Sequence, residues 1–492
     1  MASSATAIVG SGITGLLTAR ELVRAGEEIT LIERGPQRLD ADELPLAARE
    51  AALSSTDHNT EPELRKAGDP WQYAYAFGGS SLLWAGVAPR LLPADFEMSS
   101  RYGIWRDWPI SYDDLVPFYR EAERVLEVAG APHELFPSSD AYPLPPIEPS
   151  AADRLLGPLL EPFGALPVAR RAAGLEAYPP PVGSDGLEAI EPSFTMLGVA
   201  RELAASPGFS VLDRTVAAKL RIESDSVTAI ECVSAGGEHS ELRADRVVLA
   251  THGIENAALL LRSGLEGKAV GRWLGDHVHV QLELELERPV EHWRASSRDS
   301  GISYAWADGA WRAERAAAVV IPFNPGLMVR DPLTDALASG DGGVSLRRRM
   351  AERFARTLVV YVSLEDAPRE ERRVELSSRR DGLGIPLSKV AYPPDSEYVE
   401  RGLAQVRQGL EERLRPLGAR VVGRRFGNRG GHMLGTCFMG PAGVVDENLR
   451  HHQVRNLYVA GGSAFPTHSP LHPTTTIAAL ALRLGDHLAR EA

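Results

Sequence analysis

A glycine-rich turn near the N-terminus constrains the fold more than any other feature of this sequence. Residues 7–9 predict a buried strand and residues 16–25 a helix, and three glycines in the order GxGxxG join them: Gly10, Gly12 and Gly15. The first permits a tight turn, the second lets the backbone approach a pyrophosphate, and the third lets the helix pack on the strand. The pattern therefore predicts the start of a Rossmann-like α/β domain.

An acidic residue follows this turn at the spacing that a dinucleotide site requires. Glu33 ends the next predicted strand, residues 29–33, and stands 18 residues after Gly15. An acid in this place accepts hydrogen bonds from the adenosine ribose hydroxyls and disfavours a 2′-phosphate. We therefore expect FAD or NAD rather than NADP, with Ile13, Thr14 and Arg34 beside the ligand. A structural turn that binds no ligand is the alternative.

Length and composition set the remaining bounds. The 492 residues exceed what a single hydrophobic core usually contains, so two domains, or one domain with a large lobe, are expected. The net charge of −13 argues against nucleic acid as a partner, and no apolar run is long enough to span a membrane. Only Cys232 and Cys437 are present, so we predict neither disulfides nor a metal site. Residues 1–6 lack the features of a signal peptide, and we expect a cytoplasmic protein.

Hydrophobic periodicity divides the chain into alternating sections. We expect a dinucleotide-binding domain assembled from residues 1–130, 193–277 and 426–492, a linker or part of the substrate domain over 131–192, and a substrate domain over 278–425. Residues 40–70 are predicted to form a polar surface excursion and residues 112–128 and 475–490 helices. The other elements expected are strands at residues 210–212, 227–233, 246–250, 278–286, 316–321, 357–363 and 456–460.

Four sequence blocks choose between the two dinucleotides. They are residues 78–86 (GGSSLLWAG), 247–256 (VVLATHGIEN), 432–437 (HMLGTC) and 443–463, from GVVD to LYVAGGS. Together with the N-terminal turn, they resemble the glucose-methanol-choline (GMC) family of FAD-dependent oxidoreductases, in the order that the family shows. The resemblance implies a discontinuous Rossmann-like FAD-binding domain, a second domain with an antiparallel sheet, and oxidation of an alcohol.

The resemblance also implies which residues contact FAD. Some family members bind the flavin covalently through a histidine just before the tryptophan of the first block; Leu83 stands there in this chain, so we expect non-covalent FAD. The N-terminus of the last helix should face the flavin and favour negative charge on it. Beyond the N-terminal turn, the expected contacts are Gly78, Gly79, Ser80, Ser81, Trp84, Ala85, Gly86, Val216, Ala250, Thr251, Gly253, Asn256, Gly462, Ser463, Pro473, Thr474 and Thr475.

Two histidines are candidates for the chemistry. Alcohol oxidation needs a base for the hydroxyl proton while hydride leaves for flavin N5, and histidine suits this task near neutral pH. By resemblance, His432 is the principal proton acceptor and His472 its partner on the substrate oxygen, although the two roles could be exchanged. His468 lies nearby in sequence and could line the same pocket without chemistry. The motif around Asp276 and His277 is interpreted as structural support.

The blocks look closest to those of bacterial members that oxidise sugars or pyranoses. We therefore expect an alcohol group of a sugar, aminosugar, glycoside or polyol to be oxidised to an aldehyde or ketone, with O₂ or another acceptor as the final oxidant. Three alternatives remain: a lyase of the same family whose FAD takes no part in redox chemistry, an oxidoreductase for a non-sugar alcohol, and a non-catalytic or NAD-binding Rossmann protein.

Overall fold

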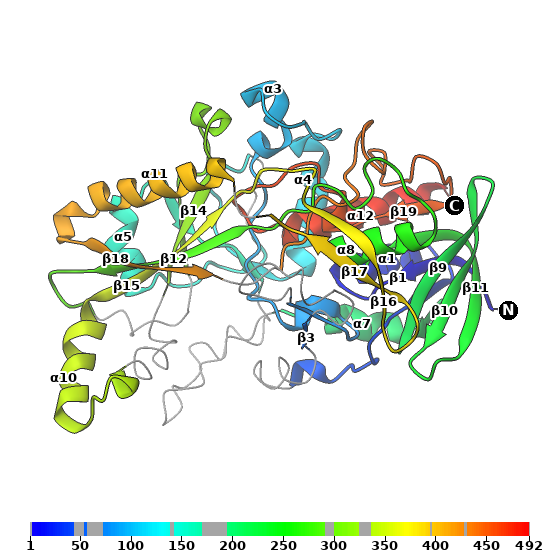
Figure 1. Cartoon of the computed structure of the whole chain (residues 1–492), viewed down its shortest axis with the longest axis horizontal. Coiled ribbons are helices and arrows are strands. Elements are labelled where there is room, and N and C mark those ends of the chain that lie inside the picture. The colour runs from blue at the N-terminus through cyan, green and yellow to red at the C-terminus, as the bar shows by residue number, and fades with distance from the viewer. Residues whose placement is uncertain are drawn as a thin grey trace.

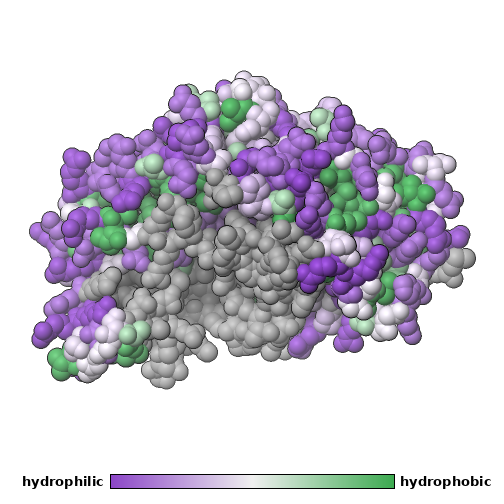
Figure 2. Space-filling view, in the orientation of Figure 1, coloured by the Kyte–Doolittle hydropathy of each residue, from purple (hydrophilic) through white to green (hydrophobic). Residues whose placement is uncertain are grey.

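The computed structural model describes residues 2–43, 54–56, 72–137, 142–169, 194–290, 300–323, 336–393, 396–427 and 431–491. Two sheets lie next to each other along the long axis of the molecule, and both termini are near the same end (Figure 1). The described surface in this view is mostly hydrophilic, with only scattered apolar residues (Figure 2). Within the described residues, no helix is long and apolar enough to cross a membrane.

The first sheet is built around the N-terminal strand. Strand β1 (Ala2–Val9) pairs in parallel with β2 (Ile29–Ile32) on one side and with β11 (His239–Leu249) on the other. The parallel pairing places the carboxyl ends of these strands at one edge, where ligands of such sheets bind. The sheet is completed by β8 (Phe209–Leu212), β9 (Thr215–Glu223), β10 (Ser226–Ser234) and β19 (Leu457–Val459).

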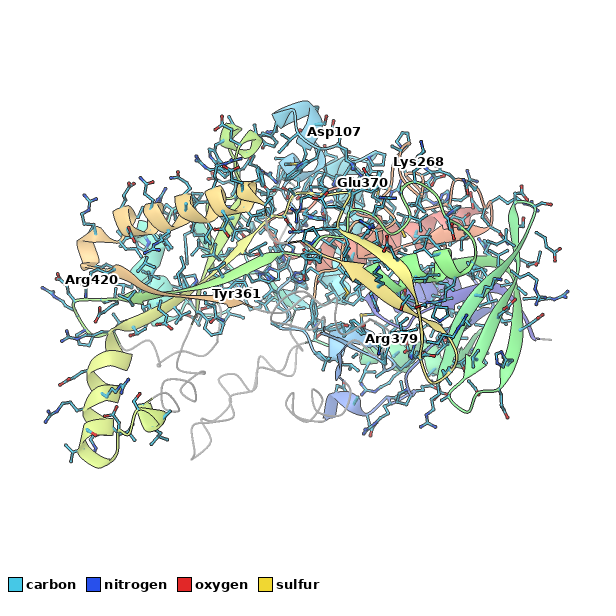
Figure 3. The ribbon with its side chains drawn as sticks, in the orientation of Figure 1. Asp107, Lys268, Tyr361, Glu370, Arg379 and Arg420 are labelled. Carbon is cyan, nitrogen blue, oxygen red and sulfur yellow. The ribbon has the colours of Figure 1, made fainter. Side chains whose placement is uncertain are left out.

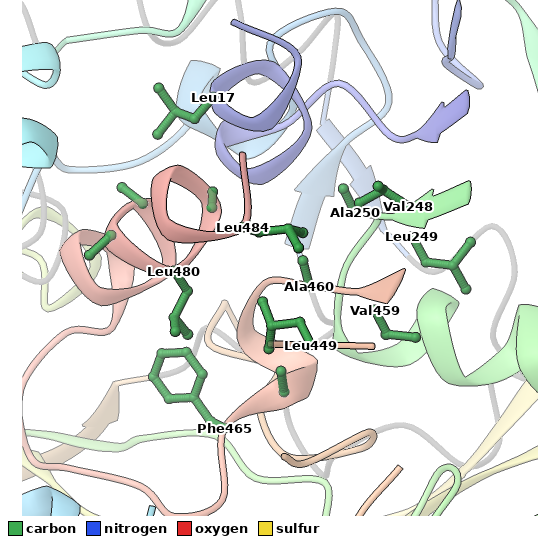
Figure 4. Packing of buried hydrophobic residues seen from close by; sticks show 14 of the residues in the cluster. Leu17, Val248, Leu249, Ala250, Leu449, Val459, Ala460, Phe465, Leu480 and Leu484 are labelled. Carbon is green, nitrogen blue, oxygen red and sulfur yellow. The ribbon is translucent and has the colours of Figure 1, made fainter. Parts of the chain in front are cut away.

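Helices from both ends of the sequence pack beside this sheet. Helix α1 (Ile13–Arg24) packs against α12 (Thr474–Glu491), and α12 packs against α4 (Tyr112–Val125). Their apolar faces share one core, which Figure 4 shows through Leu17, Leu480 and Leu484. Burying a leucine side chain stabilises the fold by about 1.5–3 kcal/mol. Helix α7 (Leu197–Ala204) packs against α1, and α8 (Gly253–Arg262) packs against β9.

The second sheet is antiparallel throughout and six-stranded. Its order is β18 (Arg420–Gly427), β12 (Val278–Glu285), β15 (Thr357–Leu364), β14 (Ala318–Phe323), β13 (Gly301–Trp306) and β6 (Phe163–Ala165). Alternate residues such as Val280 and Leu282 belong to a second core, together with residues of α11 (Glu397–Arg413). The intervening residues, His279 and Gln281, point to the opposite face.

A hairpin connects the two halves. Strands β16 (Arg373–Arg380) and β17 (Pro386–Ala391) leave the antiparallel sheet and pack against α8 of the first sheet's layer. The smaller elements are β3 (Ser54–Thr56), β4 (Gln72–Ala74), β5 (Val128–Ala129), β7 (Val168–Ala169), α3 (Met98–Tyr102), α5 (Ala151–Leu156) and α10 (Gly343–Arg353).

The α/β class, the Rossmann-like first sheet and the antiparallel second sheet agree with the sequence predictions, but several boundaries differ. The first sheet is mixed, because β10 pairs antiparallel with both β11 and β9. The helix predicted over 112–128 ends at Val125, because residues 128–129 pair with β7. Helix α1 begins at Ile13 rather than at residue 16, since Gly12 already has the extended conformation of an N-cap. The segment over 131–192, expected as a linker or as part of the substrate domain, contributes β6 to the antiparallel sheet. Most of the predicted excursion over 40–70 lies outside the described residues.

Candidate active site

A cavity of about 660 Å³ is lined by both sheets. The glycine turn, the carboxyl ends of β1 and β2 and the start of α12 contribute to one part of its wall, and the antiparallel sheet contributes to another. The predicted site residues that line it are Gly10, Gly12, Ile13, Thr14, Glu33, Arg34, Gly79, Ser80, Ser81, Trp84, Ala85, Val216, Ala250, Thr251, Gly253, His432, Gly462, His472, Pro473 and Thr474.

The three glycines of the turn have different surroundings. Gly10 has a φ of +103°, which a side chain would strain, and its N–H donates to the Ile32 carbonyl at 2.8 Å. A Cβ on Gly15 would lie 1.9 Å from the Gly10 oxygen, so only glycine permits this close packing of helix on strand. A Cβ on Gly12 would meet no atom within 4 Å. Gly12 therefore leaves room for a ligand rather than for another part of the protein.

Glu33 and Arg34 line the cavity next to this turn. The Glu33 carboxylate accepts hydrogen bonds from the Ser11 N–H at 3.0 Å, the Ser11 hydroxyl at 2.6 Å and the Gly35 N–H at 2.8 Å. Burial raises the pKa of Glu33, and these hydrogen bonds oppose the rise. Oε2 accepts both bonds from Ser11 and Oε1 accepts only the one from Gly35, so the lone pair left for a ribose hydroxyl is on Oε1. Arg34 pairs with Asp381 of the hairpin turn at 3.3 Å.

Six predicted contact residues do not line the cavity: Gly15, Gly78, Gly86, Asn256, Ser463 and Thr475. Their side chains or conformations instead shape the backbone beside it. Gly78 has a φ of +101°, which begins the turn that carries Gly79 to Ser81 into the wall, and Gly86 has a φ of +76°. Thr475 is fully buried and donates to the Ala88 carbonyl at 2.8 Å.

Asn256 connects two loops of the cavity wall. Its side-chain oxygen accepts from the Thr251 N–H at 3.1 Å and the Thr251 hydroxyl at 2.6 Å. Its side-chain nitrogen donates to the Ala460 carbonyl at 3.0 Å and to the Ser463 hydroxyl oxygen at 2.8 Å. The residue thus holds the turn after β11 against the turn after β19, and it acts on the cavity through these neighbours.

The two candidate catalytic histidines lie together on the wall. The ring centroids of His432 and His472 are 5.1 Å apart and the rings are nearly perpendicular, at 85°. His472 comes directly before Pro473 at the entry of α12, whereas His432 follows β18. Burial lowers the pKa of His432 to about 4, so the imidazole is neutral at neutral pH and has a lone pair available to accept a proton.

Asp276 and His277 hold the segments that carry both histidines. An Asp276 carboxylate oxygen accepts from the backbone N–H of His432 at 3.2 Å. The Nε2–H of His277 donates to the Leu471 carbonyl at 3.0 Å, directly before His472. Both residues are buried. The structural role that the sequence indicated therefore has a specific form: one dipeptide fixes the backbone beside each histidine.

The antiparallel sheet adds residues to the wall that the sequence reasoning missed. They are His279 and Gln281 on β12, Ile321 and Phe323 on β14, and Tyr361 on β15; Figure 3 marks Tyr361 on this sheet. The available signal was the spacing of His277 and His279, which puts both rings on one face of an extended chain. Their centroids are 5.5 Å apart and the rings are stacked.

The neighbouring His468 does not line this cavity. Its ring is buried against Gly275, where a Cβ would lie 1.5 Å from its Cε1 atom, and its Nδ1 atom lies 3.0 Å from the Asp366 carbonyl oxygen. The ring therefore fills a packing position. Tyr73 and His252, which stack at 4.5 Å, are further wall residues that the sequence did not indicate.

Comparisons with known proteins match two family models and relatives that cover nearly the whole chain. Residues 368–481 match the family model "GMC oxidoreductase", and residues 8–38 match "NAD(P)-binding Rossmann-like domain". The chain is 28% identical to the fructose dehydrogenase large subunit of Gluconobacter japonicus, over 98% of this chain and 97% of that protein. It is 29% identical to the 6'''-hydroxyparomomycin C oxidase of Streptomyces lividus, over 98% of this chain and 92% of that protein.

A solved structure shows the same fold over nearly the whole length. Pyridoxine 4-oxidase from Mesorbium loti superposes with a TM-score of 0.66 at 21% identity, covering 98% of this chain and 99% of that one. The arrangement of a Rossmann-like part and an antiparallel sheet is therefore shared with a known oxidase. The cavity described above is lined by residues of both parts.

Proposed function

This chain belongs to the GMC oxidoreductases, and we propose that it oxidises an alcohol group of a sugar, aminosugar, glycoside or polyol, with FAD bound non-covalently in the cavity. The single observation that carries the proposal is the pairing of His432 and His472 on the wall of the same cavity that the glycine turn lines. A candidate dinucleotide site and a candidate base therefore lie in one cavity, as an oxidation that uses both requires.

The residues of the wall fit FAD. Gly12 leaves open space next to the N-terminus of α1, where the free backbone N–H groups and the helix dipole favour a pyrophosphate. A Cβ on Gly79 would lie 2.8 Å from the Gly12 Cα, so the two backbones form one narrow cradle. Glu33 on the same wall would accept hydrogen bonds from the ribose hydroxyls. Leu83 lines the wall where a covalent link would need a histidine, and this supports non-covalent binding.

The protein's own groups would perform the proton transfer. His432, neutral through burial, accepts the hydroxyl proton, and His472 donates a hydrogen bond to the substrate oxygen and orients the carbinol carbon. Bound FAD supplies the hydride acceptor for that carbon. Pro473 and Thr474 bring the N-terminus of α12 to the wall, and the partial positive charge of this helix end favours negative charge in the cavity.

The chemistry of the remaining wall supports a hydroxyl-rich substrate. His279, Gln281 and Tyr361 offer hydrogen-bonding groups from one face of the antiparallel sheet, next to apolar Ile321 and Phe323. Polar groups of this kind select a substrate with several hydroxyls. The printed names of the relatives, a fructose dehydrogenase subunit and an oxidase of an aminoglycoside, agree with this class. They give no support to a lyase.

A parallel substrate screen tests the proposal. FAD-loaded protein is offered sugars, aminosugars, glycosides, polyols and simple alcohols, and both peroxide release and reduction of a dye are recorded. We expect turnover with a member of the hydroxyl-rich classes, and turnover about 10²–10⁴-fold slower in a His432→Ala variant that retains FAD. Turnover confined to simple alcohols would overturn the substrate class, and the ratio of peroxide to reduced dye assigns the acceptor.

A further inference from the structure

Three imidazoles converge beside the proposed catalytic pair. His277, His279 and His432 each offer a ring nitrogen, and these nitrogens all lie within 4.8 Å of one another. The ring centroid of His277 is 4.7 Å from that of His432, and the His279 centroid is 5.6 Å from it. Proton transfer as proposed above uses the rings of His432 and His472, and it assigns no proton to the rings of His277 and His279.

The hydrogen bonding of His277 directs one of its nitrogens into this group. A carbonyl oxygen can only accept, so the contact with Leu471 fixes the proton on Nε2 and leaves a lone pair on Nδ1. The residue is only 3% exposed, and its Nδ1 atom has no hydrogen-bond partner among the described residues. A histidine that donates one N–H to a backbone carbonyl and offers the other nitrogen has the arrangement typical of a metal ligand.

The type of ligand selects the type of ion. Three imidazoles without a carboxylate suit Zn²⁺ and similar transition metals, whereas Mg²⁺ and Ca²⁺ need oxygen ligands. Nitrogens around a tetrahedral Zn²⁺ stand about 3.4 Å apart, given Zn–N distances of about 2.0–2.1 Å. Ring movements of about 1 Å would close the present group to that spacing. His472 lies beside the group, with its ring centroid 5.8 Å from that of His279.

We propose that His277, His279 and His432 bind a divalent transition-metal ion, with Zn²⁺ as the expected ion, and that its binding is incompatible with turnover. A metal ion bound to His432 occupies the ring-nitrogen lone pair that would accept the hydroxyl proton. The ion and the alcohol therefore compete. The predicted inhibition of turnover rests on the proposed function, whereas metal binding itself does not.

Direct binding tests the first half. FAD-loaded protein, stripped of metals with a chelator, is titrated with Zn²⁺ by calorimetry, together with His279→Gln, His277→Gln and the control His239→Ala, which removes an exposed imidazole. We expect one ion per wild-type chain, retained by the control and bound at least tenfold more weakly by both site variants. Equal uptake by wild type and His279→Gln, or no uptake by wild type, would overturn the site.

X-ray absorption of the Zn²⁺-loaded wild type provides a measurement that does not depend on how the variants fold. Three imidazole ligands support the site, and a shell of oxygens alone overturns it. Inhibition is measured separately: Zn²⁺ should raise the apparent KM for the alcohol and Mg²⁺ should not. Binding of the ion without inhibition contradicts the competition. Binding without any alcohol turnover leaves the metal site established and rejects the proposed function.

Discussion

The imidazole rings of His432 and His472 lie 5.1 Å apart at 85°, although 40 residues separate them in the sequence. This near-perpendicular pair lets two rings approach one substrate oxygen from different directions. In the account given above, one ring accepts the proton and the other holds the oxygen.

The partner role of His472 predicts a graded series of variants. His472→Asn keeps a side-chain N–H donor, so we expect it to lose less activity than His472→Ala, by about tenfold, which is the effect of about 1.4 kcal/mol of hydrogen bonding to the substrate oxygen. The comparison is made on kcat/KM for the alcohol found in the screen. Equal losses in the two variants would show that His472 does not act by hydrogen bonding.

Gly12 and Gly15, two of the three glycines of the N-terminal turn, predict different defects on substitution: one in FAD binding and the other in stability. Gly15→Ala places a methyl group 1.9 Å from the Gly10 oxygen and should lower the free energy of unfolding by about 1–3 kcal/mol. Gly12→Ala meets no protein atom, so the FAD-free protein should keep its stability while its affinity for FAD falls at least about tenfold. Denaturant unfolding and FAD titration separate the effects. A stable Gly15→Ala or a tightly binding Gly12→Ala would contradict this assignment.

The hydrogen bond from the His432 N–H to Asp276 predicts a positioning effect. Asp276→Ala removes the acceptor, so we expect kcat to fall by about tenfold to a hundredfold, because small misplacements of reacting groups are costly. FAD content and KM should change little. Asp276→Asn retains an oxygen acceptor and should restore most of kcat; a failure of this rescue would assign the effect to the lost charge instead.

Buried neutral histidines predict how stability depends on pH. Burial lowers the pKa of His468 from 6.5 to about 3 and that of His432 to about 4. Between pH 6.5 and these values the unfolded chain binds protons that the folded chain does not, so stability falls as the pH falls and levels off below the folded pKa. Each such histidine contributes a slope of about 1.4 kcal/mol per pH unit.

His468→Gln tests this dependence outside the catalytic pair. Removing one buried imidazole removes about one proton from the difference in proton binding between the unfolded and folded states. The slope of the unfolding free energy against pH, between pH 6 and pH 4, should therefore fall by about 1.4 kcal/mol per pH unit. Denaturant unfolding at several pH values measures it, with the exposed His239→Ala as the control that keeps the wild-type slope. An unchanged slope in His468→Gln would show that this ring is protonated in the folded protein.

Local sequence patterns predicted much of the fold because steric limits and the burial of apolar side chains act within short segments. The glycine turn, the apolar strands and the period-2 alternation of β12 and β15 each specify an element through sterics or burial. The end of the helix at Val125 was not predictable in this way, since it depends on the pairing of residues 128–129 with residues far along the chain. The position of β6 beside β13 in the second sheet likewise depends on pairing with residues far along the chain.

The candidate site likewise contains residues that local motifs indicate and residues that only the tertiary arrangement brings to it. Motif positions indicated His432 and His472, and the structure places both on one cavity wall. Asn256 was expected to contact the ligand, but its four hydrogen bonds all go to neighbouring loops, which a motif does not reveal. Tyr361 was missed because its place on the wall follows from how the two sheets meet, whereas for His279 the spacing from His277 was a signal that the sequence reasoning did not use.

The central claim is that bound FAD and His432 act together on an alcohol, and rapid anaerobic mixing measures this directly. Wild-type protein mixed with the alcohol found in the screen should lose its oxidised-flavin absorbance, and His432→Ala with equal FAD content should do so about 10²–10⁴-fold more slowly. Flavin absorbance that persists in the wild type, or that decays at the wild-type rate in His432→Ala, would contradict the account.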